Sequence, residues 1–334
     1  MNVLLTSVGR RAYMVKYFKK AVGENGQVHV CNSDNLTVAF HYADKSVISP
    51  LIYDDNYIPF LLNYCRENKI DILISLFDID LLVLAQNKEK FREIGTNVIV
   101  SDKEFIEVCN DKWKTYLYLK DNGFNVPRTY LTKDETLEAL EKGELSFPII
   151  IKPRFGCGSI SISVAHDMDD FNYLVRKVQR EVESTYLRFE SSVVKEKIVY
   201  QEFLKGQEYG ADIINNIKGE LQNVIIRKKL AMRSGETDIA ELVDDPIINE
   251  ELVKLGNITK HIANLDCDIF LVNKKAYILE MNARFGGGYP FSYMGGCDLP
   301  QAIVNWIANK PVSKQMLQSQ TGIRGFKELG ITKD

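Results

Sequence analysis

The stretch that decides the fold of this chain reads Asp266-Cys267-Asp268-Ile269-Phe270-Leu271, then a polar turn at Asn273-Lys274-Lys275, then Ala276-Tyr277-Ile278-Leu279-Glu280-Met281-Asn282-Ala283-Arg284-Phe285-Gly286-Gly287-Gly288. Two apolar arms that flank a short polar turn predict a β-hairpin. Glu280, Asn282 and Arg284 stand two residues apart on the second arm, so their side chains leave the same face of the strand.

The polar face of this hairpin predicts a binding site. An acid, an amide and a guanidinium that share one face are costly to bury without a ligand. Asp268 on the first arm adds a second carboxylate, and Asp266 is an alternative for the same role. Hard oxygen donors suit Mg²⁺ bound together with phosphates, and arginine suits a phosphate or a carboxylate. The alternative interpretation is a surface hairpin that carries an Arg–Glu pair.

The bulk composition is that of a soluble globular protein with two or three lobes. The chain has 334 residues, enough to bury a large core, and its 45% hydrophobic and 26% charged residues are ordinary values. A formal net charge of −3 gives no electrostatic reason to expect a nucleic-acid partner.

Cysteine and histidine usage indicates neither disulfides nor a zinc site, because these residues are scattered. The N-terminal apolar run Val3-Leu4-Leu5 is too short for a signal peptide, and no stretch reaches the length of a membrane span. We therefore expect a cytoplasmic protein with reduced thiols and no membrane partner. The residues concerned are Cys31, Cys65, Cys109, Cys157, Cys267, Cys297, His29, His41, His166 and His261.

The N-terminal part of the chain alternates strands with helices. Strands are expected at 2–6, 27–31 and 70–75, with helices at 10–21 and 57–68, and this alternation predicts a parallel sheet covered on both faces. The first βα turn has a single glycine and lacks the G-x-G-x-x-G motif, so a nicotinamide oxidoreductase is only a distant alternative. Arg10 and Arg11 follow the first strand and are either substrate contacts or solvated residues of a helix start.

A strand followed by a glycine-rich loop opens the middle of the chain. The apolar run Phe147 to Ile151 predicts a buried strand that ends in Lys152-Pro153, and a second strand is expected at 160–165. The loop between them is not a Walker A motif, which would enter a helix. Its glycines could let backbone N–H groups approach phosphate oxygens, whereas the alternative is a hairpin turn without a ligand.

Antiparallel strands are expected in the second half of the chain. A helix at 169–183 precedes strands at 198–204, 209–215 and 221–230, the last of which contains Arg227-Lys228-Lys229. Residues 233–237 are polar and glycine-containing, as in a mobile loop, and a helix at 249–264 leads into the hairpin. Helices followed by antiparallel strands predict an α+β lobe beside the first domain.

In their order along the chain, these motifs resemble those of the ATP-grasp superfamily, which includes the carbamoyl-phosphate synthase large chain, biotin carboxylase and the D-alanine–D-alanine ligases. The resemblance spans roughly residues 1 to 310, and E-x-N-x-R after an upstream acid is its most specific part. The motifs are Asn110-Asp111-Lys112, Ile151-Lys152-Pro153, Phe155-Gly156-Cys157-Gly158-Ser159, Gln201-Glu202-Phe203, Gly206-Gln207-Glu208-Tyr209, Asp268, and Glu280-Met281-Asn282-Ala283-Arg284.

The resemblance implies a nucleotide site and a metal site. The residues implied for ATP binding are Lys112 and Lys152 at the phosphates, Gly156, Cys157, Gly158 and Ser159 as a flap, Gln201, Glu202, Phe203 and Leu204 as the hinge that reads adenine, Glu208 at the ribose, and Lys228 as a basic residue on the neighbouring strand. The implied Mg²⁺ ligands are Asp268, Glu280 and Asn282. The implied catalytic residues are Arg284, facing the transferred phosphoryl group or acyl phosphate, and Lys152.

The implied activity is that of an ATP-dependent carboxylate–amine (or thiol) ligase. Such an enzyme uses ATP and Mg²⁺, with Mn²⁺ as a substitute, to form an acyl phosphate that an amine attacks. Phosphoryl transfer needs positioning and charge neutralisation, which lysines, an arginine and a metal supply, and a flap that excludes water protects the acyl phosphate. The alternatives are phosphorylation of bicarbonate or carbamate, as in carbamoyl-phosphate synthesis, and a non-catalytic ATP-binding module.

The expected fold class is α/β plus α+β. A parallel-sheet (pre-ATP-grasp) domain at 1–110 precedes a two-lobed ATP-grasp domain at 111–312 and a C-terminal tail at 313–334. The small lobe is expected at about 125–203 and the C-terminal lobe at about 204–312. The expected partners are small-molecule carboxylate and amine substrates, and a homodimer is the default for a soluble enzyme.

Overall fold

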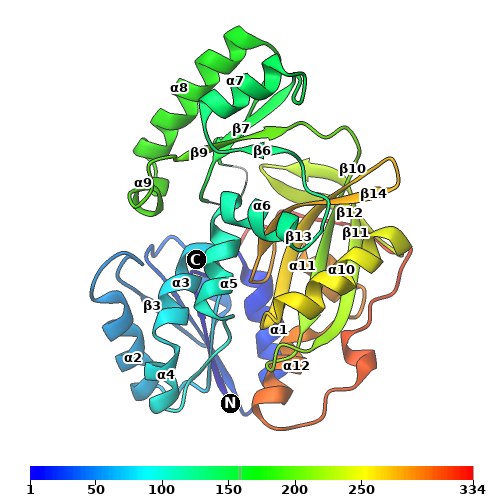
Figure 1. Ribbon diagram of the computed structural model, residues 1–334. Coiled ribbons are helices and arrows are strands. Elements are labelled where there is room, and N and C mark those ends of the chain that lie inside the picture. The colour runs from blue at the N-terminus through cyan, green and yellow to red at the C-terminus, as the bar shows by residue number, and fades with distance from the viewer. Residues whose placement is uncertain (157, 159, 334) are drawn as a thin grey trace.

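The computed structural model describes residues 1–156, 158 and 160–333, which form three bodies around a common centre (Figure 1). An N-terminal domain lies at the lower left of the view, a small lobe at the top, and a larger lobe at the right. This arrangement confirms the expected class, a parallel-sheet domain followed by antiparallel sheets. The residue limits expected for the domains stay a prediction.

The N-terminal domain is a five-stranded parallel sheet in the order β3-β2-β1-β4-β5. The chain crosses from one strand to the next through helices, as parallel pairing requires. Its strands are β1 (Asn2–Thr6), β2 (Gln27–Asn32), β3 (Lys45–Ile48), β4 (Ile72–Ser75) and β5 (Asn97–Val98), and its helices are α1 (Ala12–Val22), the 3₁₀ turn η1 (Val38–Tyr42), α2 (Tyr57–Glu67), α3 (Asp78–Gln86) and α4 (Lys88–Glu93).

Two helices lead from this domain to the small lobe, which is a four-stranded antiparallel sheet in the order β6-β9-β7-β8. Helices α7 and α8 lie on the outer side of this sheet (Figure 1). The elements are α5 (Lys103–Asn110) and α6 (Lys112–Asp121), then β6 (Thr129–Tyr130), α7 (Lys133–Glu141), β7 (Ile149–Pro153), β8 (Ser163–Ala165), α8 (Met168–Ser184), α9 (Leu187–Ser191) and β9 (Ile198–Glu202).

The large lobe is a six-stranded antiparallel sheet in the order β14-β13-β10-β11-β12-β15. One face packs against α10, so side chains that alternate along each strand divide between a buried apolar face and a polar face. The elements are β10 (Gln207–Asn215), β11 (Leu221–Arg233), β12 (Glu236–Val243), α10 (Pro246–Thr259), β13 (Ala263–Val272), β14 (Lys275–Asn282), α11 (Tyr289–Met294), α12 (Leu299–Ile307), the 3₁₀ turn η2 (Lys314–Leu317) and β15 (Arg324–Phe326).

The hairpin expected from the sequence is β13–β14. Its register pairs Asp268 with Glu280 and Asp266 with Asn282, and a bulge follows Asp268. Asn273 and Lys274 form the turn with φ of 48° and 59°, the left-handed conformation that two-residue hairpin turns need. The carboxylates of Asp268 and Glu280 are therefore brought side by side by strand pairing alone.

Two local expectations need correction, and the C-terminal tail adds a strand that was not expected. Residues 233–237 are the tight connection between β11 and β12, and Glu236 already belongs to a strand. The helix expected at 249–264 is α10, which ends at Thr259, so that 263 and 264 open β13. The C-terminal tail contributes β15, which pairs with β12 at the edge of the large sheet.

The apolar core joins the N-terminal domain to the large lobe. Helix α1 packs against α12, and buried side chains of both elements, such as Phe18 and Ile303, belong to one cluster. The small lobe has a separate core that includes Ile151, Phe171 and Val178. Within the part of the chain that the structure describes, no helix is both long and apolar enough to cross a membrane.

A fully buried histidine joins α10 to the large sheet. The Nε2 of His261 donates to the carbonyl oxygen of Ile213 at 3.0 Å, and the Thr259 hydroxyl lies 2.8 Å from Nδ1. Burial lowers the pKa of His261 to about 4, with the Ile213 carbonyl opposing that shift. The ring is therefore neutral at pH 7, with its proton on Nε2.

We expect His261 to make the protein less stable in mild acid. The unfolded chain binds a proton at this residue near pH 6.5, whereas the folded chain does so only near pH 4. Stability is therefore lost as pH falls through this window, by about 3 kcal/mol at its lower end. In denaturant titrations at several pH values, His261→Gln should flatten this fall and the exposed-site control His41→Gln should not. Equal slopes in wild type and His261→Gln would contradict the assignment.

Candidate active site

The polar face of the large sheet lines a cavity of about 110 Å³ beneath the glycine flap. Strand alternation places its side chains on the face opposite α10. Glu280, Asn282 and Arg284 all line it, as their spacing predicts. The other lining residues are Arg11, Gly158, Arg227, Lys229, Met232, Gly235, Glu236, Thr237, Asp266, Asp268, Gly287 and Gly288.

Two lysines neutralise the carboxylates of this face. Lys229 Nζ lies 2.6 Å from Asp268 Oδ1 and 2.6 Å from Glu208 Oε1. Burial lowers the pKa of Lys229, but Asp268 and Glu208 outweigh it and raise that pKa above its ordinary value, so the side chain is an ammonium. Lys112 Nζ lies 3.4 Å from Glu280 Oε1. Positive and negative side chains therefore alternate across this face and contact one another directly.

The expectation for Lys228 is off by one residue. Adjacent side chains of a strand point to opposite faces, and Arg227 and Lys229 both contact the polar face. Lys228 therefore lies on the α10 side, and Lys229 is the basic residue that β11 brings to Glu208. A run of three basic residues in the sequence does not reveal which of them shares the face of the site.

Lys152 is fully buried and is held by Gln201. Its Nζ donates to Gln201 Oε1 at 2.8 Å, and Gln201 Nε2 in turn donates to Thr129 Oγ1 at 2.9 Å. Burial lowers the pKa of Lys152 to about 8; Glu280 and Asp268 oppose this shift, whereas Lys112 adds to it. The side chain of Gln201, expected in the adenine hinge, thus orients a lysine. Thr129 is a supporting residue that no sequence motif indicated.

A separate apolar slot of about 230 Å³ lies along the hinge between the two lobes. It is lined by Gln201 to Leu204, as expected, with Ile150 on one side and Phe270 and Leu279 of the hairpin on the other. The Glu202 carboxylate accepts from the backbone N–H of Arg128 at 3.1 Å. A mostly apolar slot of this size beside the hinge fits a flat heteroaromatic ring.

The expected flap is only partly described. Cys157 and Ser159 lie outside the described residues. Gly156 and Gly158 have φ of 96° and 68°, which favour glycine, and the Gly156 carbonyl accepts from Lys112 Nζ. Gly158 reaches the cavity beside Asp268 and Glu280. Gly158 therefore borders the polar face, and Gly156 is tied to it through Lys112.

A buried row of alternating charges runs beneath the cavity. The guanidinium of Arg227, 1% exposed, donates to both Asp212 and Asp266. Arg284 also donates to Asp266, at 3.2 Å, and to Asp78 of α3 at 2.9 Å. Burial would raise the pKa of Asp266, but Arg227 and Arg284 hold it below its ordinary value. The row joins the large lobe to the N-terminal domain.

This row assigns different environments to the two candidate metal ligands. Asp266 is committed to two guanidinium groups, whereas Asp268 contacts only Lys229 among the described residues. Asp268 also pairs directly with Glu280 across the hairpin. Its carboxylate is therefore the one that a cation at the cavity could share with Glu280 and Asn282.

Three consecutive glycines allow the buried row to pack. A Cβ atom on Gly288 would lie 2.1 Å from Arg227 Nε, and one on Gly286 would lie 2.2 Å from the Asp266 carboxylate. Cβ atoms in proteins essentially never lie this close to another heavy atom. The backbone at Gly286 and Gly288 thus lies closer to these charged side chains than it could if either residue carried a Cβ atom.

We expect Gly288→Ala to destabilise the protein, because its methyl group displaces the buried Arg227. Overpacking of a filled site costs about 1–3 kcal/mol, and misplaced charges would also weaken nucleotide binding. Gly287→Ala is the matched control, since its Cβ would first meet the flexible Glu236 side chain, at 3.2 Å. Thermal unfolding and MgADP titration of both variants measure the difference. Equal effects would refute the close approach.

Several site residues were missed from the sequence. Arg227, Lys229, Asp78 and Phe270 carry no motif, and their role follows from pairing partners far along the chain. Arg11 was one of two arginines left open; it donates to the carbonyl oxygens of Leu76 and Phe285 and lines the cavity. The alternation of Arg227 and Lys229 on one strand was the local signal that could have found those two residues.

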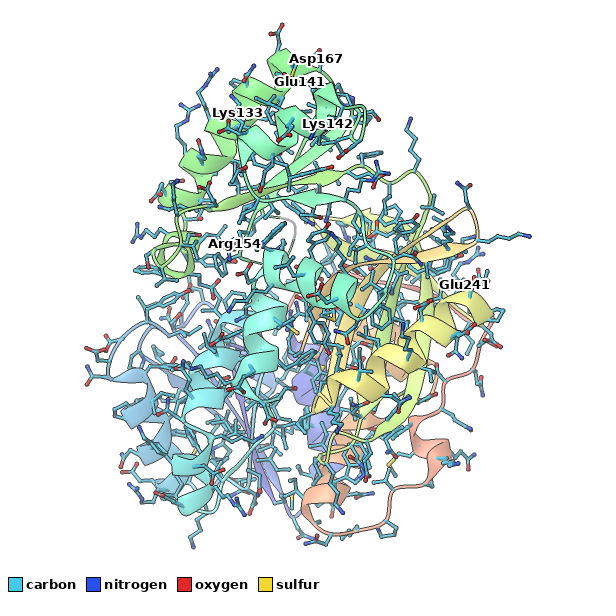
Figure 2. All side chains as sticks on the ribbon, in the orientation of Figure 1. Lys133, Glu141, Lys142, Arg154, Asp167 and Glu241 are labelled. Atoms are coloured by element: carbon cyan, nitrogen blue, oxygen red, sulfur yellow. The ribbon has the colours of Figure 1, made fainter. Side chains whose placement is uncertain are left out.

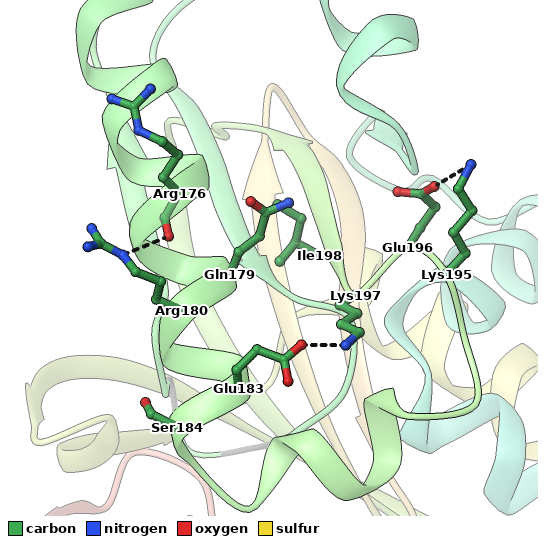
Figure 3. Close-up of a pocket in the computed structure, with 9 residues that line it drawn as sticks. All are labelled: Arg176, Gln179, Arg180, Glu183, Ser184, Lys195, Glu196, Lys197 and Ile198. Atoms are coloured by element: carbon green, nitrogen blue, oxygen red, sulfur yellow. Dashed lines mark hydrogen bonds and ion pairs between the residues drawn. The ribbon is translucent and has the colours of Figure 1, made fainter.

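A hollow of about 800 Å³ on the outer face of the small lobe is a separate feature (Figure 3). It lies between α8 and the segment before β9. Lys197 there pairs with Glu183, and Lys195 pairs with Glu196. Its lining shares no residue with the polar cavity or the hinge slot.

Comparison with known proteins identifies the family of both domains. Residues 3–99 match the family described as PylC-like, N-terminal domain, and residues 109–288 match the ATP-grasp domain. The carbamoyl phosphate synthase large chain of Pseudothermotoga lettingae is 24% identical over 88% of this chain, which spans only 26% of that protein. The D-alanine–D-alanine ligase of Bacillus anthracis is 25% identical over 69% of this chain and 76% of the relative.

Solved structures share the fold. The biotin carboxylase domain of Hydrogenobacter thermophilus 2-oxoglutarate carboxylase, crystallised with MgADP, ADP and bicarbonate, has a TM-score of 0.73 at 17% identity, covering 95% of this chain and 72% of that one. An L-amino acid ligase of Bacillus licheniformis has a TM-score of 0.68 at 20% identity, covering 96% and 78%. Since the ATP-grasp match covers more than half of its residues, the chain belongs to the ATP-grasp family.

Proposed function

We propose that the protein is an ATP-dependent carboxylate–amine (or thiol) ligase that forms an acyl phosphate and releases ADP and phosphate. The observation that carries this proposal is the register pairing of Asp268 with Glu280, with Asn282 beside them and Lys112 and Lys229 in contact. Two carboxylates matched by lysines on one sheet face form a site for a polyphosphate and its cation.

The donor set fits Mg²⁺. Two carboxylates and an amide oxygen are hard ligands, and Mg²⁺ characteristically takes only one or two protein carboxylates together with phosphates. Mg²⁺ bound by Asp268, Glu280 and Asn282 would neutralise charge that develops on the transferred phosphoryl group.

The remaining residues take roles that follow from their positions. The hinge slot binds adenine and Glu208 the ribose. Lys112 and Lys152 contact the phosphates, because both ammonium groups lie near Glu280. The flap, with Cys157 and Ser159 among its proposed members, excludes water. Arg284, which Asp78 and Asp266 fix in place, stabilises the acyl phosphate.

Relatives support ligation and leave a second candidate open. The D-alanine–D-alanine ligase and L-amino acid ligase names describe carboxylate–amine joining. The carbamoyl phosphate synthase relatives favour phosphorylation of bicarbonate or carbamate instead. ADP formation that depends on bicarbonate and needs no amine would select this second function.

We expect ADP release in the presence of Mg²⁺ to rise for particular pairs of carboxylic acid and amine. Glu280→Gln should lower that rate by about 100-fold or more, because a group that stabilises transition-state charge is lost. Glu220→Gln, which removes an exposed carboxylate from a turn of the same lobe, should not. A coupled ADP assay measures the rate, and calorimetry measures MgATP binding.

The ligase proposal fails under one combination of results. If no acid–amine pair raises turnover above background, while Glu280→Ala binds MgATP as tightly as wild type, then neither the activity nor the metal role holds.

Nucleotide affinity should fall in alkaline solution because Lys152 loses its charge. Below about pH 8 its ammonium can contact phosphate, and above that pH the free protein holds a neutral amine. We expect the MgADP affinity to drop by about 30-fold between pH 7 and pH 9.5, because the neutral amine must regain its proton on binding. Lys152→Met should bind more weakly at pH 7 and lose this dependence. A Lys152→Met variant with the wild-type pH profile would exclude the role.

Four further expectations remain predictions. They are a cytoplasmic location, the substitution of Mn²⁺ for Mg²⁺, a homodimer, and the absence of a nucleic-acid partner.

A further inference from the structure

A second cavity, of about 490 Å³, lies between the N-terminal domain and the small lobe. Ile79, Leu82 and Val83 of α3 form one wall, and Phe189 and Val193 at α9 form the opposite wall. Arg154, labelled in Figure 2, lies at this junction. The cavity is mostly apolar and is distinct from the adenine slot and the polar cavity, with which it shares no lining residue.

Aromatic rings close the rim of this cavity. Tyr53 of the N-terminal domain stacks on Phe189 of the small lobe, with ring centroids 4.5 Å apart. Val193 beside them is 83% exposed. An apolar ligand that covers the exposed apolar side chains of both walls would remove them from water, and this burial favours binding.

Most charged groups of the lining already have partners. Arg154 forms a bidentate pair with Asp111, and Lys114 pairs with Glu107. Glu190 differs, because no hydrogen bond or ion pair joins its side chain to any residue in the described ranges. Burial raises the pKa of Glu190 to about 7, Asp78 adds to the shift, and Lys112 opposes it. Lys112 itself is engaged with Gly156 and Glu280.

The floor of the cavity leads to the phosphoryl-transfer site. Asn110 lines the cavity, and its Nδ2 donates to the Asp78 carbonyl oxygen at 3.4 Å. The Asp78 carboxylate binds Arg284 at 2.9 Å. Asn110 Oδ1 is buried without a donor among the described residues. One residue, Asp78, therefore separates this cavity from the arginine assigned to the acyl phosphate.

We propose that this cavity binds the amine substrate, with an apolar or aromatic body between the two walls and its ammonium group at Glu190. The inference rests on the ligase function proposed above. An ammonium would supply the positive partner that Glu190 lacks, and its N–H groups could also satisfy Asn110 Oδ1. A carboxylate at the same end would meet the like charge of Glu190, so the site should discriminate by charge.

The test uses two probes of equal carbon number and opposite charge. The full chain with bound MgADP is titrated calorimetrically with 3-phenylpropylamine and with 3-phenylpropanoate, at about pH 8, where Glu190 is ionised. We expect the amine to bind at least about tenfold more tightly than the carboxylate, because a charge-assisted hydrogen bond is replaced by like-charge repulsion.

Three variants locate the binding. Glu190→Gln should abolish the preference for the amine, and Val83→Trp should weaken both probes by filling the cavity. Glu183→Gln removes a carboxylate that pairs with Lys197 on the same lobe and should leave binding unchanged. Far-UV circular dichroism and MgADP affinity, measured on each variant, confirm that the fold and the nucleotide site are intact.

Two results would overturn the inference: an amine that binds no tighter than the carboxylate, or an amine preference that survives Glu190→Gln. Both are separable from failure of the ligase proposal. A wild-type protein that binds no MgADP refutes the nucleotide site itself, whereas MgADP binding without charge discrimination refutes only the amine pocket.

Discussion

The structure depends on one buried guanidinium, that of Arg227. Lying between Asp212 and Asp266, it allows two carboxylates to exist inside the large lobe, and Asp266 then holds Arg284 toward Asp78 of the N-terminal domain. A buried charge without its partner is strongly destabilising, so each member of this row requires the next. Gly286 and Gly288 make room for it, because side chains at those two positions would occupy the space of Asp266 and Arg227.

On the cavity side of this row, the charged side chains have fewer protein partners. Lys229 and Lys112 neutralise Asp268 and Glu280 on the cavity side, where an incoming cation could take over the carboxylates and leave the lysines to phosphate. The site is thus built in two layers. The lower layer fixes positions, and in the proposed function the upper layer exchanges partners. Proteins commonly orient reactive groups in this way, through neighbours that do not react themselves.

The sequence predicted the parts of the fold that local pattern determines. The hairpin, the parallel-sheet domain and the shared face of Glu280, Asn282 and Arg284 follow from periodicity and spacing. The choice of Lys228 failed because three basic residues in succession do not show which one faces the site. Asp78 and Glu190 could not be found, since only the packing of α3 and α9 brings them near Arg284 and Lys112. The edge strand β15 was missed for a similar reason, because a three-residue segment pairs only where β12 offers an edge.

The location of Lys152 on the small lobe has a further consequence. Every member of the buried row belongs to the large lobe or the N-terminal domain, which share a core, whereas the small lobe has its own. A hinge rotation of the small lobe would therefore move Lys152 and the flap without disturbing Arg227, Asp266 or Arg284. The reorganisation energy of Arg227, Asp266 and Arg284 is then settled when the protein folds, whereas the field of Lys152 would be added only when the small lobe closes.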